Sequence, residues 1–385
     1  MPPIPLLVFV LLALVGHVVF WVGFVNRTHA CGWNHRVVDA LTMISAVALA
    51  GVPLWAAWLW AAGGWPAVRQ STALAAYAWV MAPLTVLSIV HQVWLRLHPE
   101  RRTVSKSVTA ERIDFRPELG LGIANPVPRA FCRLPGNQVL TLSVERLTLG
   151  LPRLPGELAG LKIALLADLH MSGRFGIELY QKIIEQANAW RPDLVILAGD
   201  LVEKDHCTPW VADTYGRLTA PLGVHYVLGN HDKKCDHAAV RRALDAVGAV
   251  DVSRQAAQVE HNNHVIQIAG NELPWFGPPA EFTDPGANAD PDLRLVVAHN
   301  PDQFGWAVER GADLMLAGHN HGGQVQFPPL GPVLTPSLHG TRYACGTFRR
   351  GDTIMHVTRG TGSLAPFRYF CPPELTLITL EQPSS

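Results

Sequence analysis

Asp, Asn and His side chains follow directly after apolar runs throughout the C-terminal two thirds of this chain. The first run is Leu161–Ala167, and Asp168 and His170 follow it. Four further runs end in Gly199-Asp200, Gly229-Asn230-His231-Asp232, His299-Asn300 and Gly318-His319-Asn320-His321. Apolar runs of this length are typical of strands buried on both faces of a parallel sheet. Because open α/β sheets bind their ligands at strand ends, the five runs predict a metal site at one edge of the core.

The types of these residues, Asp, Asn and His, indicate which metal ions the site would bind. On an extended chain, Asp168 and His170 would point to the same side, as would His319 and His321. Carboxylate and imidazole ligands without a thiolate suit Mn, Fe or Zn better than Ca. Two such ions about 3.5–4 Å apart can clamp an in-line phosphoryl displacement. An acidic residue would have to bridge them, because two bare dications at that separation repel each other.

The N-terminal region predicts a membrane anchor. The chain has 385 residues, of which 49% are hydrophobic and only 16% charged, which is too apolar for an ordinary soluble enzyme. Residues 4–25, 40–60 and 74–95 carry no Asp, Glu, Lys or Arg, and each run is long enough for a membrane-spanning helix. A cleavable signal peptide is the alternative for the first run, but this run lacks a preceding basic region and two more spans follow it. We therefore expect a transmembrane region over residues 1–95.

The basic residues between these runs predict the orientation. Only Arg69 lies between the second and third runs, whereas the other basic residues near the spans are Arg27, Arg36, Arg96, Arg101, Arg102 and Lys106. The positive-inside rule then places the N-terminus outside and the C-terminal domain in the cytoplasm. The chain is thus expected to be a multi-pass protein of the inner, cytoplasmic membrane.

The rest of the chain divides into a linker and a folded domain. Residues 96–138 are rich in Pro, Gly and Arg and lack a sustained period, which predicts a basic linker lying against anionic headgroups. Residues 139–385 alternate strand-like and helix-like segments, as an α/β domain does. Up to residue 138 the net charge is +6, and from residue 139 onward it is −6. An acidic domain argues against a nucleic-acid substrate.

The polar residues at the ends of the five apolar runs also resemble the motifs of a known family. DLH at 168–170, GD at 199–200, GNHD at 229–232, His299 and GHNH at 318–321 resemble, in the same order, the calcineurin-like metallophosphoesterases. The AHNPD and GHNHGGQ forms and the CPPELTLITL ending resemble the membrane-associated bacterial branch. That branch includes UDP-2,3-diacylglucosamine pyrophosphatase-type and transmembrane metallophosphoesterase-domain proteins. The resemblance implies a four-layer α/β/β/α sandwich after the three transmembrane helices, and two divalent ions, Mn, Fe or Zn.

The same resemblance assigns roles to single residues. It makes Asp200 the bridge between the ions. It assigns the other ligands as Asp168, His170 and His321 on one ion and Asn230, His299 and His319 on the other. His231 would donate a proton or a hydrogen bond to the reacting group, with Asp232 orienting its ring; a purely structural histidine is the alternative. Weaker candidates for binding substrate are Arg174, Arg342, Arg359 and Arg368, for which a solvated or structural role is the alternative.

Several functions remain compatible with these residues. The first is hydrolysis of a phosphodiester or pyrophosphate by a metal-bridged hydroxide, at the membrane, on a nucleotide-linked lipid such as UDP-2,3-diacylglucosamine of lipid A biosynthesis. The second is a tethered phosphodiesterase of broad specificity for soluble substrates. The third is a catalytically silent metal-binding or signalling module, which would predict a missing ligand, whereas none of the expected ligands is missing. Protein phosphatases of this superfamily read GDxVDRG, from which GDLVEKD at residues 199–205 departs.

Overall fold

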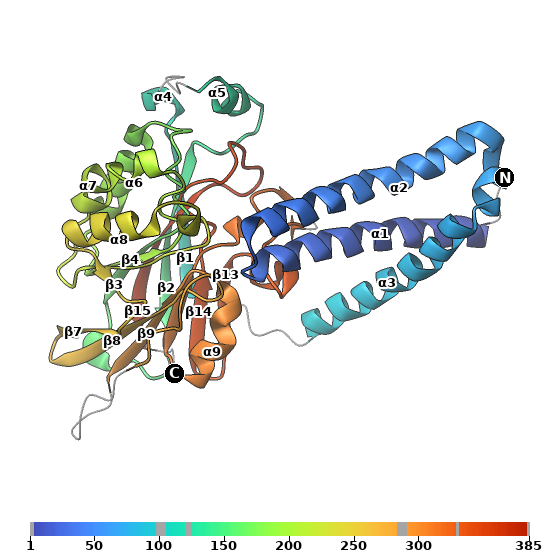
Figure 1. Cartoon of the computed structure of the whole chain (residues 1–385). Helices are drawn as coiled ribbons and strands as arrows, with labels where there is room; N and C mark the ends of the chain where they lie inside the picture. Colours follow the sequence, from blue (N-terminus) through green and yellow to red (C-terminus); the bar gives the residue numbers. More distant parts are fainter. Residues whose placement is uncertain (1–3, 98–104, 120–124, 283–290, 329–330, 383–385) are drawn as a thin grey trace. The chain divides into compact units, whose positions relative to one another are not determined.

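Three long helices make up the N-terminal unit. The computed structural model describes residues 4–97, 105–119, 125–282, 291–328 and 331–382, which form two compact units, Met1–Pro99 and Glu100–Ser385 (Figure 1). The first unit contains α1 (Ile4–Ala30), α2 (His35–Gln70) and α3 (Thr72–Leu97), and all three are long and apolar enough to cross a membrane. Each helix extends beyond the charge-free run that predicted it. Within α2, Gly63 and Gly64 leave the helical conformation.

Polar side chains connect these apolar helices to one another. The buried ring of His17 lies with Nδ1 2.6 Å from the Tyr77 hydroxyl and Nε2 3.1 Å from the carbonyl oxygen of Leu49, so α1 contacts both α3 and α2. The Thr85 hydroxyl on α3 donates to the carbonyl of Leu12 on α1 at 2.5 Å. Hydrogen bonds between helices are a common means of association in lipid, where the hydrophobic effect does not hold helices together.

Two β-sheets form the centre of the second unit. The seven-stranded sheet has, in spatial order, β1 (Ser105–Asp114), β2 (Thr141–Gly150), β15 (Glu374–Glu381), β3 (Lys162–Leu166), β4 (Leu194–Ala198), β5 (Val224–Val227) and β6 (Val250–Asp251). The six-stranded sheet has β13 (Gly346–Arg350), β14 (Thr353–Val357), β10 (Leu314–Ala317), β9 (Leu293–Ala298), β8 (His264–Asn271) and β7 (Ala257–His261). A short separate ribbon pairs β11 (Gln326–Phe327) with β12 (Gly331–Pro332).

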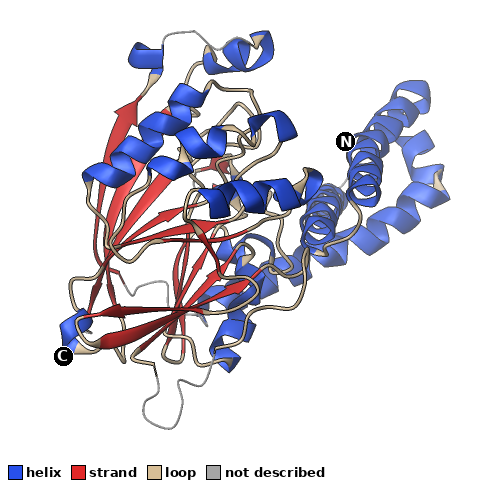
Figure 2. Cartoon of the chain, turned by 60° about the vertical axis from the view of Figure 1, so that its left-hand side comes forward, coloured by secondary structure: helices blue, strands red, loops and turns tan. Residues whose placement is uncertain are grey.

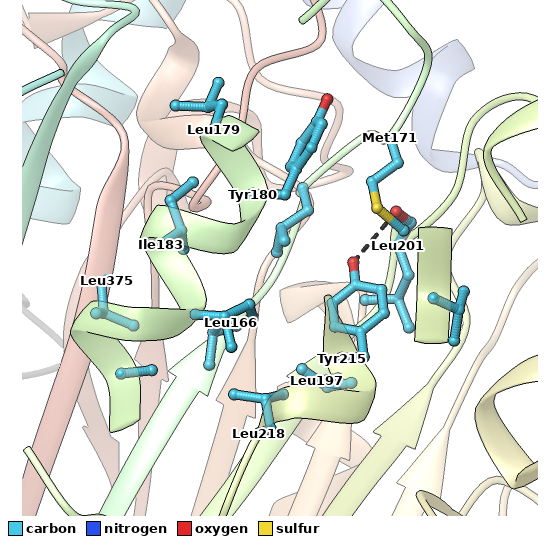
Figure 3. Close-up of a cluster of buried hydrophobic side chains, with 14 of the residues drawn as sticks. Leu166, Met171, Leu179, Tyr180, Ile183, Leu197, Leu201, Tyr215, Leu218 and Leu375 are labelled. Atoms are coloured by element: carbon cyan, nitrogen blue, oxygen red, sulfur yellow. Dashed lines mark hydrogen bonds between the residues drawn. The ribbon is translucent and has the colours of Figure 1, made fainter. Parts of the chain in front are cut away.

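The sheets pack face to face, and helices cover their outer faces (Figure 2). Fully buried side chains of both sheets, such as Ile196 and Leu295, meet in the central core. On the other face of the seven-stranded sheet pack α6 (Ile177–Ala189), α7 (Trp210–Asp213) and α8 (His237–Ala246); Figure 3 shows part of this layer, with Ile183 of α6 near Leu166 and Leu375. The short α9 (Phe304–Glu309) covers the six-stranded sheet. The predicted four-layer α/β/β/α architecture is confirmed.

The five predicted strands are present, but they belong to two sheets. β3, β4 and β5 are neighbouring parallel strands of the seven-stranded sheet, and β9 and β10 are neighbouring parallel strands of the six-stranded sheet. The site residues therefore come from two facing sheet edges instead of one. The strands read as continuous apolar runs because each is covered on one face by the opposite sheet and on the other by a helical layer.

The predicted linker is shorter than expected. Residues 105–114 form β1, which pairs antiparallel with β2 from Ser105 opposite Leu149 to Asp114 opposite Thr141. The helices α4 (Arg116–Leu119) and α5 (Pro126–Cys132) follow it. β1 is an edge strand, and edge strands commonly carry charged side chains that discourage further pairing, so its sequence shows no apolar period. Arg101 and Arg102, on which the orientation partly rests, lie outside the described residues.

Candidate metal centre

The structure brings together all nine residues predicted from the strand ends. Asp168 and His170 follow β3, Asp200 follows β4, and Asn230, His231 and Asp232 follow β5. From the facing sheet come His299 after β9 and His319 and His321 after β10. Eight of the nine are buried, and Asn230 is half-buried. The position just beyond each strand lets side chains of both sheets reach the space between the sheet edges.

The backbone at these positions differs from the expected extended chain. Positive φ angles occur at five site residues, namely Asp168 (57°), His170 (49°), Asp200 (53°), His319 (72°) and His321 (50°). The left-handed region is uncommon for residues with a Cβ atom and costs free energy, so the surroundings must hold it in place. Part of this support is visible, because the backbone N–H of His319 donates to both carboxylate oxygens of Asp168 at 3.0 Å. The prediction that alternation along a strand aims these side chains is therefore wrong.

One cluster of ligand atoms contains Asp168, His170, Asp200 and His321. The Nε2 atoms of His170 and His321 lie 2.9 Å apart, and Nε2 of His170 lies 3.6 Å from Oδ2 of Asp200. Nε2 of His321 lies 3.8 Å from Oδ1 of Asp168. One ligand atom from each of the four residues lies within 4.8 Å of all the others, which is a separation that a single bound cation can span.

A second cluster shares Asp200 with the first. Nε2 of His299 lies 3.2 Å from Oδ2 of Asp200, from Oδ1 of Asn230 and from Nδ1 of His319. The other ring nitrogen of His299 donates to the carbonyl of Ala198 at 2.8 Å, which leaves Nε2 directed at the site. Gly229 is needed between these groups, since a Cβ atom there would lie 2.2 Å from Oδ1 of Asp200.

The electrostatics of both clusters favour a bound cation. Burial lowers the pKa of His170 to about 3 and lowers the pKa of His319 and of His321 well below the ordinary value, so these rings are neutral at pH 7 and offer lone pairs. Burial raises the pKa of Asp168 to about 7. Burial also acts to raise the pKa of Asp200, but His299 and His231 outweigh it and lower that pKa.

Two further observations show how the residues fit a metal ion. Burial acts to lower the pKa of His299, yet the adjacent Asp200 carboxylate raises it to about 9. Without a metal ion, a proton on His299 therefore balances the charge of Asp200, and a bound cation would take over that role. Nε2 of His319 is buried and has no hydrogen-bond partner among the described residues. Imidazoles, carboxylates and one amide, with no thiolate, form a donor set suited to divalent Mn, Fe or Zn.

Comparisons with known proteins agree with this geometry. The family model for calcineurin-like phosphoesterases matches residues 161–323, which run from the start of β3 past the last histidine. An uncharacterized metallophosphoesterase of Bacillus subtilis, YkuE, is 30% identical over 241 residues, covering 59% of this chain and 82% of that protein. The chain belongs to the calcineurin-like metallophosphoesterase family.

Other relatives of this metallophosphoesterase carry more specific names. The Escherichia coli phosphodiesterase YaeI is 32% identical over 227 residues, covering 58% of this chain and 83% of that protein. The UDP-2,3-diacylglucosamine pyrophosphatase LpxG of Chlamydia muridarum is 24% identical over 295 residues, covering 62% of this chain and 88% of that protein. Membership of the family makes the chain a metal-dependent hydrolase of phosphoric esters or pyrophosphates.

Asp232 does not orient the ring of His231, contrary to the sequence-based prediction. Its buried carboxylate accepts hydrogen bonds from the backbone N–H groups of Leu201 at 3.0 Å, Val202 at 2.8 Å and Gly229 at 2.8 Å. Asp232 thus holds the turn after β4 against the turn after β5. The phosphoesterase uses it to position backbone, and backbone partners of this kind are not visible in a sequence motif.

Glu203 contacts the His231 ring instead, and the sequence reasoning missed it. Its carboxylate lies 3.7 Å from Nδ1 of His231, 3.6 Å from Nδ1 of His170 and 3.2 Å from Nη1 of Arg174. Burial acts to raise the pKa of Glu203, but the neighbouring His231 and His170 outweigh it and lower that pKa to about 2. The sequence did offer one indication of Glu203, because it is an acidic residue only three positions after Asp200.

Trp275 is a second residue that the motifs did not reveal. It follows β8, is buried, and packs its ring 5.5 Å from that of His299 and 4.8 Å from that of His319. A large apolar ring there excludes water from one side of both imidazoles.

The four candidate arginines have different surroundings. Arg368 is fully buried and donates to the carbonyls of His321 and Arg359, both at 2.9 Å, and of Gly362 at 2.5 Å. Arg359 forms ion pairs with Glu374, at 2.9 Å, and with Glu145.

Arg174 and Arg342 lie nearer to solvent. Arg174 binds Glu203 and the carbonyl of Leu364, and Arg342 lies over the ring of Tyr343 at 5.4 Å. Arg359 and Arg368 are thus both held by several partners within the protein. Arg174, whose side chain is 29% exposed, remains the arginine in contact with a site residue that solvent can reach.

Proposed function

We propose that this phosphoesterase holds two divalent ions and hydrolyses phosphodiester or pyrophosphate bonds at a membrane. The observation that carries the proposal is the sharing of Asp200 by two clusters of ligand atoms. We assign Asp168, His170, Asp200 and His321 to one ion and Asp200, Asn230, His299 and His319 to the other. Manganese, iron and zinc each match these donors.

Different residues of the chain have different roles in the proposed reaction. Two bound ions would supply Lewis acidity and an activated water for in-line displacement at phosphorus. His231 is the proton donor that we assign to the leaving oxygen, because its ring lies at the site without belonging to either four-residue ligand set. The Glu203 carboxylate lies 3.7 Å from Nδ1 of His231 and so supports the position of that ring beside the site. Trp275 shields the ligand rings from water on one side.

For the substrate, we propose a lipid-linked pyrophosphate of the UDP-2,3-diacylglucosamine type, as in lipid A biosynthesis. The three candidate membrane helices and the likeness to LpxG support it. The basic residues near the spans support an inner-membrane protein with its hydrolase domain in the cytoplasm, where nucleotide-linked lipids are made. The greater identity to the phosphodiesterase YaeI favours a second candidate, a tethered phosphodiesterase for soluble substrates.

Metal content tests the dinuclear site. The purified full-length chain should hold two divalent ions by elemental analysis, and Asp200→Asn should weaken the binding of both because the proposed bridge touches both. Asp205→Asn removes an exposed carboxylate five residues away and should leave metal content unchanged. A single ion per chain that Asp200→Asn does not affect would contradict the proposal.

Substrate choice needs a separate comparison. Manganese-dependent hydrolysis of UDP-2,3-diacylglucosamine should be compared with that of an aryl phosphodiester by the same reconstituted enzyme. A kcat/KM clearly in favour of the nucleotide lipid supports the first candidate. Equal or greater turnover of the aryl ester supports the tethered phosphodiesterase.

A further inference from the structure

The hydrolase unit exposes large apolar side chains in one region. Among the described residues of 100–385, nine Val, Leu and Phe side chains are exposed. Seven of them belong to three segments: Val127, Phe131 and Leu134 in residues 125–138, Phe327, Leu334 and Leu338 in the described residues of 323–343 (323–328 and 331–343), and Phe370 in residues 364–371. Single exposed apolar residues are normal on a protein surface, but such a concentration marks an interaction site.

Direct contacts join the three segments into one surface, which we call the apolar rim. The ring of Phe131 stacks on that of Phe367 with their centroids 5.8 Å apart. The Asn137 side chain donates to the carbonyls of both Phe131, at 2.8 Å, and Pro366, at 3.0 Å. Val325 forms a β-bridge with Tyr369, next to Phe370. The rim is therefore built from the α5 region (labelled in Figure 1), the β11–β12 ribbon and the loop before β15.

The rim is continuous with the metal centre. Its middle segment begins two residues after His321, and Gly323 packs so closely on the ribbon that a Cβ atom there would lie 2.5 Å from that of Pro332. In the third segment, Arg368 and the Cys371 thiol both donate to the carbonyl of His321, at 2.9 Å and 3.3 Å. A surface that covered the rim would lie beside the ligand His321.

The charge of the rim is opposite to that of its domain. Its three segments contain no Asp or Glu, whereas residues 139–385 as a whole have a net charge of −6. Arg133 is exposed on the rim, Arg129 is half-buried beside it, and Arg342 is half-buried in the middle segment. Asp302, outside the three segments, accepts hydrogen bonds from the Ser337 hydroxyl and the backbone N–H of Leu338 in the middle segment. An apolar surface whose own charged side chains are all arginines complements an anionic lipid surface.

The chain itself limits which surface is within reach. α3 ends at Leu97 and β1 begins at Ser105, so only seven residues separate a candidate membrane span from the hydrolase unit. Seven residues reach no further than about 25 Å even when fully extended. By chain length alone, a bilayer that α3 crossed would be within reach of the hydrolase unit, whereas any other partner has to arrive by diffusion.

We propose that the apolar rim docks on the bilayer that α1–α3 cross, with Phe327 and Phe370 entering the interfacial region and Arg129 and Arg133 facing anionic headgroups. The proposal rests on the membrane anchoring in the proposed function. It deepens that function, because a metal centre whose rim rests on lipid receives its phosphoester from the membrane surface. Free substrates in solution would have to enter by another side.

Lipid photocrosslinking tests the docking directly. The full-length chain is reconstituted into vesicles of phosphatidylcholine and phosphatidylglycerol that contain a phosphatidylglycerol with a photoactivatable acyl chain, and the adducts are mapped by mass spectrometry. We expect adducts in α1–α3, as an internal standard, and in residues 125–138, 323–343 and 364–371. The double variant F327S/F370S should lower adducts of the rim, relative to those of α1–α3, by about tenfold.

Matched measurements separate docking from folding and from catalysis. Phe327 and Phe370 are 54% and 65% exposed, so their replacement should not disturb the core. V250S alters an exposed apolar side chain on β6, at the sheet edge opposite β1, and should leave the rim adducts unchanged. Hydrolysis of a soluble aryl phosphodiester should be the same in all three proteins, and its absence in the wild type would count against the proposed activity alone.

Three outcomes would overturn the docking. The first is a set of adducts confined to α1–α3, and the second is rim adducts that persist in F327S/F370S. The third is protein–protein cross-links between rim segments of two chains, which would make the rim an interface between copies of this protein.

Discussion

Asp200 and His231 show how neighbouring residues of this site do different work. The Asp200 carboxylate lies among His170, His299 and the backbone N–H of His231, which donates to it at 2.7 Å. The His231 ring instead packs at right angles to that of His170, with centroids 4.7 Å apart, and reaches toward Glu203. Removing the ring leaves the backbone N–H in place, so the ligand carboxylate keeps its support.

His231→Ala should therefore lower kcat by a factor on the order of 10²–10⁴ while metal content is unchanged. The loss should be smaller for a substrate whose leaving group is already a weak base, because such a group needs no proton. Steady-state kinetics with aryl esters of graded leaving-group pKa, together with elemental analysis, measure both effects. His237→Ala removes an exposed histidine six residues away and is the control. Loss of metal from His231→Ala would make His231 a ligand or a support residue instead.

At the scale of elements, the loop after β14 supports the ligands from behind. Gly360 has a φ of 79°, and a Cβ atom there would lie 2.8 Å from that of Asp168. The backbone N–H of Thr361 donates to the carbonyl of Ala167, and that of Gly362 donates to the carbonyl of Asp168. The first ligand strand is thus held by a loop almost two hundred residues later in the chain.

Gly360→Ala should displace Asp168 and weaken metal binding by about 10- to 100-fold, as changes behind a ligand commonly do. Gly351→Ala is the matched control, since its φ of 61° imposes the same kind of backbone strain while its Cβ would meet no atom within 4 Å. Titration of each full-length variant with Mn²⁺ gives the dissociation constants. Equal affinities in the two variants would show that strain alone, and not contact with Asp168, matters.

A buried ion pair attaches the same loop to the sheet, and it predicts a pH dependence of stability. Burial acts to raise the pKa of Glu374 at the start of β15, but Arg359 and His356 outweigh it and lower that pKa to about 2. A carboxyl group whose pKa is lower in the folded than in the unfolded state stabilises the fold above its unfolded pKa. That stabilisation is lost as the pH falls from about 4.5 toward 2.

Glu374→Gln should therefore lower the free energy of unfolding at pH 7 by about 3 kcal/mol. The difference from the wild type should shrink below pH 4.5 and vanish near pH 2. Thermal unfolding of the detergent-solubilised chain across this pH range measures it. Glu118→Gln breaks a surface ion pair with Lys182 and should show no comparable pH dependence. A constant difference between pH 2 and 7 would contradict the assigned pKa of Glu374.

At the scale of the whole molecule, two units of different composition share one chain. The N-terminal unit is apolar and basic, and the hydrolase unit is acidic apart from its apolar rim. The orientation proposed from the basic residues decides which substrates the metal centre can reach, because nucleotide-linked lipids are made on the cytoplasmic side.

Reporter fusions after Ser385 test this orientation. A reporter that is active only in the cytoplasm should give a signal, and one that is active only after export should give none. Fusions after Gln70, between the second and third predicted spans, should give the opposite pattern and serve as the control. An exported signal at Ser385 would place the site outside, out of reach of a cytoplasmic nucleotide lipid, and would favour the tethered phosphodiesterase.

The sequence by itself determined the strands, their order and the residue types at their ends, because burial on both faces demands continuous apolar runs and metal ligation demands a few side-chain types. It also indicated three helices long enough to span a membrane. It did not reveal β1, since an edge strand buries little apolar surface, nor the division of the five strands between two sheets. Strand periodicity carries no information about which sheet a strand joins.

Only the tertiary structure decided how the ligands are aimed and supported. The left-handed backbone at Asp168 and His321 is imposed by hydrogen bonds and packing from distant segments, so no local alternation could predict it. The same applies to Glu203 beside His231 and to Trp275 over two ligand rings. The apolar rim likewise exists only after folding, because α5 ends at Cys132 whereas the β11–β12 ribbon begins at Gln326 and the loop before β15 comes later still. Contacts between residues far apart in the chain depend on the whole fold, which local sequence patterns do not encode.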